Sequence, residues 1–312
     1  MQITNPTLSP APVERIFSLA PRFIFLLFLL AAGVFLSTGC TAKIKKARHL
    51  SRADKYYNTG QYAKAEVEYL NVVQLDSTNA HVLGRLGSIY YEEGRPIRSY
   101  AFLKKASELN PNDLDLQLKL SNIDVARGNP NGAYEKALSV LSKSPTNPEA
   151  PVLLADSITN QAQAELVRAR LDKLSNQIGD TAPLQLGYGS LFIREHQLTD
   201  AEAAYKRAQI LDPKSSAVYF RLGMLRLLQN DLKGADAELK TASDLAPLRS
   251  VLKTKFADFK LQTGQIQEGK RLLAEMTKAS PDYLPAWIRL AEGAQQRGSN
   301  GPGARAQIIQ CY

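Results

Sequence analysis

Gly264–Lys270 is the segment whose residue types come nearest to a site for chemistry. It reads G-Q-I-Q-E-G-K and carries both glycines and the lysine of a P-loop, in which backbone N–H groups and a lysine hold phosphates. The next residue is Arg271, where a P-loop needs Ser or Thr for the magnesium ion, and a P-loop must also follow a strand. Both glycines fall on positions of an internal repeat described below. We therefore expect a turn between two helices here, and no nucleotide site.

The three histidines, His49, His81 and His196, are far apart in the sequence. None has a second ligand at the spacing of H-E-x-x-H or C-x-x-C, and no serine lies in a G-x-S-x-G elbow. The two cysteines, Cys40 and Cys311, cannot build a disulfide framework. The sequence thus predicts a protein that is not an enzyme and that holds no metal and no cofactor.

Cys40 closes an N-terminal segment that has the layout of a secretory signal peptide. Fourteen apolar residues run from Phe23 to Leu36, and a helix of that length rises roughly 21 Å, less than the 30 Å or so of a membrane's hydrocarbon core. The segment ends L-S-T-G-C, which resembles the lipobox of bacterial lipoproteins, where the cysteine is diacylated and becomes the new N-terminus. We interpret residues 1–39 as a lipoprotein signal peptide, Cys40 as the lipidation site and residues 40–45 as a short basic tether.

An uncleaved anchor helix is the alternative at this end of the chain. The uncharged run continues to Ala42, and Lys43, Lys45, Lys46 and Arg48 follow it. Such a helix would hold the protein in the inner membrane, and the positive-inside rule would then place its body in the cytoplasm. The lipoprotein interpretation instead predicts the periplasmic face of the outer membrane.

The remainder of the chain has an internal period of 34 residues. Repeats with phase 1 at residues 46, 80, 114, 148, 182, 216, 250 and 284 need no insertion or deletion. Phase 8 is small in all eight repeats: Ala53, Gly87, Ser121, Ala155, Gly189, Gly223, Ala257 and Ala291. Small residues there let two helices approach closely, since a larger side chain would overpack the contact. Most repeats also have glycine at phase 15, which suits a turn between helices, and proline at phase 32, which ends the second helix.

These positions resemble those of the tetratricopeptide-repeat (TPR) family over residues 46–312. Stretches such as G-Q-Y-A-K-A-E-V-E-Y at Gly60–Tyr69 and R-A-Q-I-L-D-P at Arg207–Pro213 are close to the usual sequence of that family. The resemblance implies an all-α fold in which paired antiparallel helices wind into a right-handed TPR superhelix, an α-solenoid that follows the N-terminal signal or anchor helix. The eighth repeat is incomplete, so we expect the sequence to be a fragment of a longer array.

The fourth repeat departs most from the pattern. Ala162, Val167 and Gly179 stand where the other repeats have glycine, a smaller residue and proline. Ordinary divergence with an intact fold and a flexible joint between two subarrays are both consistent with these changes.

In this family the first helix of each repeat lines a concave groove, chiefly with phases 2, 5, 9, 12 and 13. Repeats five and six place six apolar residues at those phases: Leu186, Ile193, Phe220, Met224, Leu227 and Leu228. Apolar groove residues can receive an amphipathic helix or an extended peptide, so these six are the expected partner-binding residues. For each of them, packing against the adjoining helix is the alternative. The carboxylate clamp of the family is not expected, because the first repeat has Leu50 and Asp54 where the clamp needs Lys and Asn.

The net charge of +9, from 39 Lys and Arg against 30 Asp and Glu, would suit an anionic partner. The charges are scattered, however, so solubility explains them and no nucleic-acid partner is expected.

Together these features predict a non-catalytic, membrane-anchored scaffold of the bacterial cell envelope that binds a protein or peptide in its concave groove. The chain looks similar to the TPR lipoproteins that accompany exopolysaccharide export and exosortase-type protein sorting. One alternative is a glycan- or peptidoglycan-binding protein that uses its 13 Tyr, 10 Phe and one Trp, and another is a regulatory subunit of an enzyme complex.

Overall fold

The computed structural model describes residues 42–295, and every regular element in that range is an α-helix. The helices are 42–58, α2 (Tyr62–Leu75), α3 (Ala80–Glu92), α4 (Pro96–Leu109), α5 (Leu114–Ala126), α6 (Pro130–Lys143), α7 (Ala150–Asp156), α8 (Gln161–Ile178), α9 (Ala182–Arg194), α10 (Leu198–Leu211), α11 (Ser216–Leu228), α12 (Leu232–Leu245), α13 (Val251–Gln262), α14 (Ile266–Ala279) and α15 (Leu284–Gln295). The all-α prediction is confirmed for this range. The expected signal segment, Cys40 and the end of the eighth repeat lie outside the described residues.

Two parts of the N-terminal interpretation meet the described residues. Residues 42–45, expected to be part of a tether, are the first residues of the helix over 42–58, which runs without a break into the first repeat. Of the helices between residues 42 and 295, none combines the length and the apolar character that a membrane span requires.

The turns between paired helices follow the chemistry predicted at phase 15. Gly128 and Gly264 have φ angles of +71° and +85°, a region that side chains disfavour and that glycine adopts freely. The fifth and sixth repeats lack this glycine, and His196 and Asn230 take the same left-handed conformation, with φ of 60° and 61°. The tight turn therefore persists in repeats where glycine is absent.

The small residues at phase 8 are the points at which paired helices touch. A Cβ atom added to Gly189 of α9 would lie 2.1 Å from Cε1 of Tyr205 in α10, and one added to Gly223 of α11 would lie 2.7 Å from Cγ of Leu239 in α12. The buried apolar side chains form successive clusters along the array, each shared by neighbouring helices. The core is thus extended along the chain, as stacked repeats require.

The fourth repeat keeps its helix pair but moves the turn between the helices. Helix α7 ends early, at Asp156, and α8 begins at Gln161, so that Ala162 lies in the first turn of a helix and needs no glycine. The side chain of Asn160 caps α8 by accepting a hydrogen bond from the backbone N–H of Gln163 at 3.0 Å. The unusual residues of this repeat thus accompany a shortened first helix and a lengthened second one.

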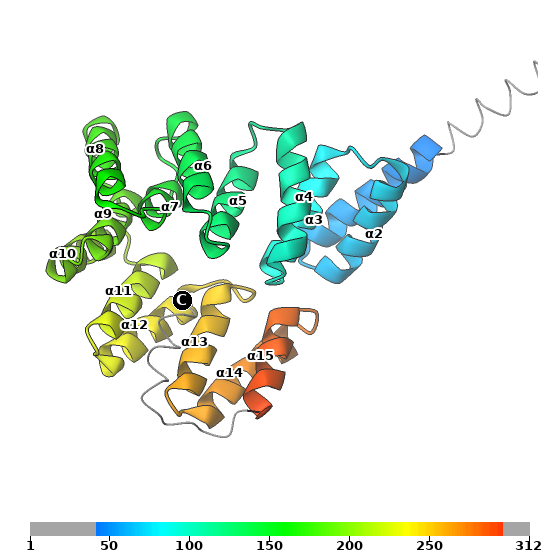
Figure 1. Ribbon diagram of the computed structural model, residues 1–312. Coiled ribbons are helices and arrows are strands. Elements are labelled where there is room, and N and C mark those ends of the chain that lie inside the picture. Colours follow the sequence, from blue (N-terminus) through cyan, green and yellow to red (C-terminus); the bar gives the residue numbers. More distant parts are fainter. Residues whose placement is uncertain (1–41, 296–312) are drawn as a thin grey trace, which may run out of the picture.

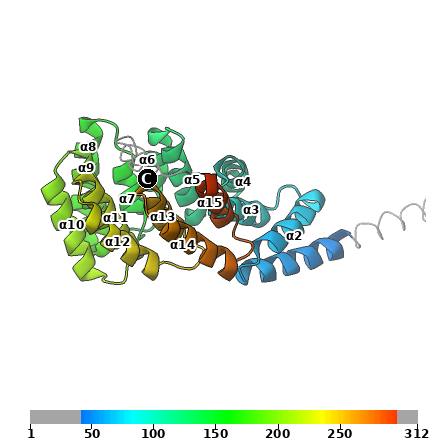
Figure 2. The same cartoon turned by 90° about the horizontal axis from the view of Figure 1, so that it is seen from below.

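The helix pairs curve round until the two ends of the described array meet (Figure 1). In Figure 1, α15 turns back towards α3 and α4 across a gap between the ribbons, and Figure 2 shows the same curve from below. The first helices of successive repeats face the middle of this curve, where the candidate site lies.

Candidate partner-binding cavity

A cavity of about 1080 Å³ lies inside the curve of the array. Its lining comes from the first helices of repeats two to seven, namely α3, α5, α7, α9, α11 and α13, with further residues from α8, α10 and the turns. Six successive repeats therefore build the cavity, and residues more than 150 positions apart in the sequence, such as Tyr91 and Val251, line it together.

Four of the six apolar residues expected in the groove line this cavity. Ile193, Phe220, Met224 and Leu228 form its apolar strip and are partly buried. These side chains come from the last turns of α9 and from one side of α11. They provide apolar surface of the kind that receives a side chain of a bound peptide.

The other two expected groove residues, Leu186 and Leu227, belong to the core, and their assignment to the groove was wrong. Each is only 5% exposed. Leu186 packs in the cluster shared by α9, α10 and α11, and Leu227 packs with Phe256 and Phe259 of the next repeat. Phase alone did not separate the two environments, because Leu186 and Phe220 both occupy phase 5 of their repeats.

An ion pair crosses the cavity wall between the fourth and the sixth repeat. Arg221 of α11 donates to both carboxylate oxygens of Asp156 at the end of α7, at 2.7 Å and 3.4 Å. Arg194 donates to the backbone carbonyl oxygen of Asp156 at 2.7 Å. Asp156 is the last residue of α7, so Arg194 supplies a donor to its carbonyl oxygen at the end of the helix, while Arg221 pairs with its carboxylate. The fourth repeat is thereby tied to both the fifth and the sixth.

The same wall of the cavity is cationic. Arg194, Arg221 and Lys255 form its cationic group, against the single carboxylate of Asp156 among the charged lining residues. Burial by itself would lower the pKa of Arg221, but Asp156 and then Tyr205 outweigh burial, so the pKa lies above the ordinary arginine value and the charge is retained. The ammonium group of Lys255 lies 5.7 Å from the centre of the Phe220 ring, within the range of a cation–π contact. Positive charge thus lies directly beside the apolar strip.

Acidic groups also lie near Tyr91, in the part of the lining that the second repeat supplies. Burial, followed by the nearby carboxylates Glu149, Glu92 and Asp115, raises the pKa of the Tyr91 hydroxyl in the lining. Burial also raises the pKa of Glu92, and the ammonium group of Lys119 acts in the opposite direction. These carboxylates act on Tyr91 from outside the lining, in which Asp156 is the one carboxylate.

Sequence reasoning missed the arginines and Lys255 as lining residues. The signal was present, since Asp156 occupies phase 9 of repeat four and Arg221 occupies phase 6 of repeat six. A repeat pattern predicts contacts between neighbouring repeats, however. Asp156 and Arg221 belong to repeats four and six, and these two repeats come together only through the curvature of the array.

Residues 80–113, the second repeat, match the family model of the tetratricopeptide repeat. The same pair of helices recurs along the described chain, with small residues at the contact between them. The fold is a tetratricopeptide-repeat solenoid. Repeats of this kind suggest a scaffold for protein–protein interaction, and their stacked helices create extended concave surfaces for binding.

Comparison with curated proteins finds more distant similarity. The chain is 24% identical over 220 residues to protein O-mannosyl-transferase TMTC1 of Homo sapiens, and 22% identical over 192 residues to BBSome complex member BBS4 of Bos taurus. These matches cover 68% and 62% of this chain, but only 24% and 37% of those two proteins. The chain therefore spans a minor part of the length of the curated relatives it matches.

Solved structures with a similar fold include two bacterial TPR proteins. TTC0263, a thermophilic TPR protein of Thermus thermophilus, is 20% identical, with a TM-score of 0.43 over 70% of this chain and 100% of that chain. A tetratricopeptide repeat protein of Parabacteroides merdae is 12% identical, with a TM-score of 0.49 over 80% of this chain and 99% of that chain.

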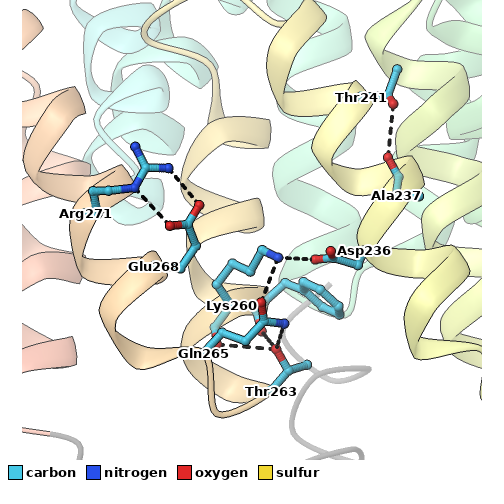
Figure 3. A network of polar contacts seen from close by, with 9 residues as sticks. Asp236, Ala237, Thr241, Lys260, Thr263, Gln265, Glu268 and Arg271 are labelled. Carbon is cyan, nitrogen blue, oxygen red and sulfur yellow. Dashed lines mark hydrogen bonds and ion pairs between the residues drawn. The ribbon is translucent and has the colours of Figure 1, made fainter.

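The glycines of the segment Gly264–Lys270 have structural roles in the solenoid. As predicted, the segment joins two helices, α13 and α14, and it follows a helix where a P-loop would follow a strand. Gly264 makes the turn, and a Cβ atom on Gly269 would lie 2.7 Å from Cγ of Leu261. The position after Lys270 holds Arg271, whose guanidinium pairs with Glu268 on the same helix (Figure 3).

A buried lysine joins the helices next to this turn. Lys260 of α13 is 6% exposed and pairs with the carboxylate of Asp236 in α12. Its ammonium group also donates to Oε1 of Gln265, in the turn before α14, at 3.0 Å (Figure 3). These contacts satisfy the buried charge and link three consecutive helices, which is a structural role.

The histidines also act within the solenoid. His49 lies 2.5 Å from a carboxylate oxygen of Glu68, and His81 lies 2.9 Å from one of Asp54, each pair joining two helices. His196 forms the turn between α9 and α10 at the rim of the cavity. In the part of the chain that the structure describes, no group of three or more His, Cys, Asp or Glu residues is arranged to hold a metal ion.

Proposed function

We propose that this chain is a non-catalytic TPR scaffold that binds a protein partner in the central cavity. The observation that carries the proposal is the juxtaposition of the apolar strip and the cationic group on one wall of a cavity of about 1080 Å³. An apolar side chain of the partner would lie on the strip, and an acidic group beside it would face the arginines and Lys255.

Phe220 is the strongest single anchor on that wall. Its ring lies in the lining and is only partly covered by its own helices, so a partner can bury the remainder. Burying an aromatic side chain at the centre of an interface contributes about 2 kcal/mol or more, which corresponds to more than tenfold in affinity. Met224, one helical turn further on, adds a flexible thioether that adapts to different partner side chains.

The proposal includes attachment to a membrane through the N-terminal segment. The sequence L-S-T-G-C before the array supports a lipid anchor at Cys40, at the periplasmic face of the outer membrane. The helix over residues 42–58 would then hold the cavity close to the membrane. Its exposed side chains Lys43, Lys45 and Arg48 would face anionic headgroups.

In this setting the scaffold would gather components of an envelope assembly. The similarity of the sequence to TPR lipoproteins of exopolysaccharide export and protein sorting supports a role beside such a system. The partner expected in the cavity is therefore a protein of the cell envelope with an apolar and acidic segment.

Site-specific photocrosslinking tests this function directly. p-Benzoylphenylalanine placed at Phe220 of the full chain should crosslink one defined envelope protein in cells that produce it. The same probe at Ile210, which is 71% exposed on α10 and outside the cavity lining, should not crosslink that protein. Equal crosslinking from both positions, or none from Phe220, would place the binding surface elsewhere.

The affinity of the identified partner then measures the contribution of the strip. Phe220→Ser with Met224→Ser should weaken binding more than tenfold in calorimetry, with circular dichroism unchanged. The matched control is Leu166→Ser with Ile210→Ser, two apolar residues that are 61% and 71% exposed away from the cavity. Loss of helicity in the first double variant would show that the strip is core. Unchanged affinity with an intact fold would contradict the proposal.

A further inference from the structure

The first repeat touches the turn between the sixth and the seventh repeats, near the rim of the cavity. The guanidinium carbon of Arg249, in the turn before α13, lies 5.0 Å from the centre of the Tyr62 ring at the start of α2. A Cβ atom added to Gly60, in the first turn of the array, would lie 3.9 Å from Nε of the same arginine. Cation–π contact at this distance joins two parts of the chain that the repeat pattern leaves unrelated.

Charged and polar groups from both ends surround this contact. Arg249 also forms an ion pair with Asp282, which holds the guanidinium in place from its own end of the array. On the other side, Glu93 at the end of α3 is 8% exposed; burial raises the pKa of its carboxyl group, and Arg95, followed by Arg249, acts in the opposite direction. Tyr283 is buried beside Asp282, and burial, followed by the carboxylate of Glu92, raises its pKa to about 12. The two ends of the array are therefore in electrostatic as well as direct contact.

The contact lies where the two ends of the cavity wall meet. Gly94, the neighbour of Glu93, lines the cavity from the second repeat, and Val251, two residues after Arg249, lines it from the seventh. Between them the lining passes round through α5, α7, α9 and α11. Figure 1 shows the corresponding curve of the array, with α15 turned back towards α3 and α4.

We propose that this contact of Arg249 with Tyr62, supported by Asp282, is a clasp that closes the cavity wall, so that the cavity admits a short peptide segment and excludes a folded domain. The proposal deepens the proposed function, since it specifies which kind of partner the cavity takes. A domain of 100 residues has a radius of gyration of about 13 Å, and a sphere of that radius alone occupies about 9000 Å³. The cavity measures about 1080 Å³, which suits a few residues of one chain.

The clasp is also weak enough to open. A partly exposed cation–π contact changes an equilibrium between open and closed forms by roughly two- to fivefold. Removing the contact should therefore increase entry of a bulky group by a similar factor, and leave entry of a thin chain unchanged.

Thiol labelling tests the clasp without a natural partner. The full chain with Cys40→Ser, Cys311→Ser and Met224→Cys carries one thiol in the cavity, and Ile210→Cys in the same background carries one on an exposed surface. Each is labelled with two probes: a maleimide on a short Gly-Ser peptide and a maleimide on a small folded domain. The domain probe should react more slowly than the peptide probe at Met224→Cys, and at the same rate as the peptide probe at Ile210→Cys.

Adding Tyr62→Ala with Arg249→Ala should raise the rate of the domain probe at Met224→Cys at least twofold, and leave the peptide probe unchanged. Tyr62→Phe keeps the aromatic face, so both probes should label it at the rates of the unmodified clasp. This variant separates loss of the contact from loss of folding. The proposal would be overturned if both probes labelled Met224→Cys at equal rates. It would also be overturned if the labelling rate of the domain probe did not change on loss of the clasp. Because no partner is involved, these outcomes are independent of whether Phe220 and Met224 bind one.

Discussion

Asp258 shows how burial by the array changes the chemistry of one residue. Its side chain is 17% exposed on α13 and lies 3.2 Å from Nε of Arg289 in the next repeat. Burial raises the pKa of its carboxyl group from 3.8 to about 6, and the opposing influence of Arg289 and Lys255 does not cancel that effect. The folded state therefore holds this proton more tightly than the unfolded state does.

The pH dependence of stability follows from that difference. The unfolding free energy contributed by Asp258 is highest below pH 3.8 and falls as the pH rises through 6, by up to about 3 kcal/mol. Asp258→Asn removes this titration, so its stability relative to the wild type should increase from pH 4 to pH 7 in urea denaturation. Asp244→Asn, at a side chain that is 62% exposed, is the matched control and should show a much smaller change. A similar pH dependence in the two variants would contradict the assigned burial.

Contact between paired helices depends on the absence of a side chain at Gly223. A Cβ atom there would lie 2.7 Å from Cγ and 3.3 Å from the backbone nitrogen of Leu239, so the neighbouring helix itself is in the way. Gly223→Leu should lower the unfolding free energy on the order of 1 to 3 kcal/mol, because α11 and α12 must separate. Ala217→Leu, at an exposed position of the same helix, should have little effect. Equal thermal stability of the two variants, followed by circular dichroism, would show that α11 and α12 do not touch at this position.

The fourth repeat shows that helix boundaries respond to caps as well as to the period. The residues of repeat four fit the period poorly, and the structure moves its turn three residues towards the N-terminus, with Asn160 as the cap of α8. The shortened α7 then exposes the carbonyl and carboxylate of Asp156 to two arginines from later repeats. A local change of helix length thus creates the polar part of the cavity wall.

At the scale of the whole molecule, the closed curve departs from the simplest picture of a solenoid. In a purely linear array each repeat contacts its neighbours alone, and the ends are independent. Here Arg249, the last residue of the sixth repeat, contacts Tyr62 of the first repeat. The cavity consequently has a continuous wall, and its accessibility is a property of the entire array.

The proposed attachment of the whole molecule to a membrane through Cys40 gives a separate prediction. Two acyl chains would provide stable anchoring, whereas a single chain gives only marginal binding. Mass spectrometry of the mature protein should find an N-terminal Cys40 with a diacylglycerol adduct, and Cys40→Ser should leave the precursor uncleaved. An intact N-terminus with an unmodified Cys40 would instead support the uncleaved anchor helix.

The sequence by itself determined the repeat, the helix pairs and the contacts between them. Gly223 at phase 8 and Gly264 at phase 15 act within one repeat, through steric fit and backbone conformation, so their spacing was sufficient to predict them. The repeat positions of the two glycines in Gly264–Lys270 also predicted that this segment joins two helices and does not follow a strand, as a P-loop would.

Only the tertiary structure decided which residues form the cavity. Leu186 and Phe220 share a phase, yet neighbouring helices cover the first, while the second faces the cavity. The pairing of Asp156 with Arg221, and the clasp of Arg249 on Tyr62, join repeats that are not adjacent. The physical reason is that the curvature of a solenoid is the sum of small rotations between successive repeats, and no single repeat encodes that sum. Contacts across the curve therefore appear only when the whole array is assembled.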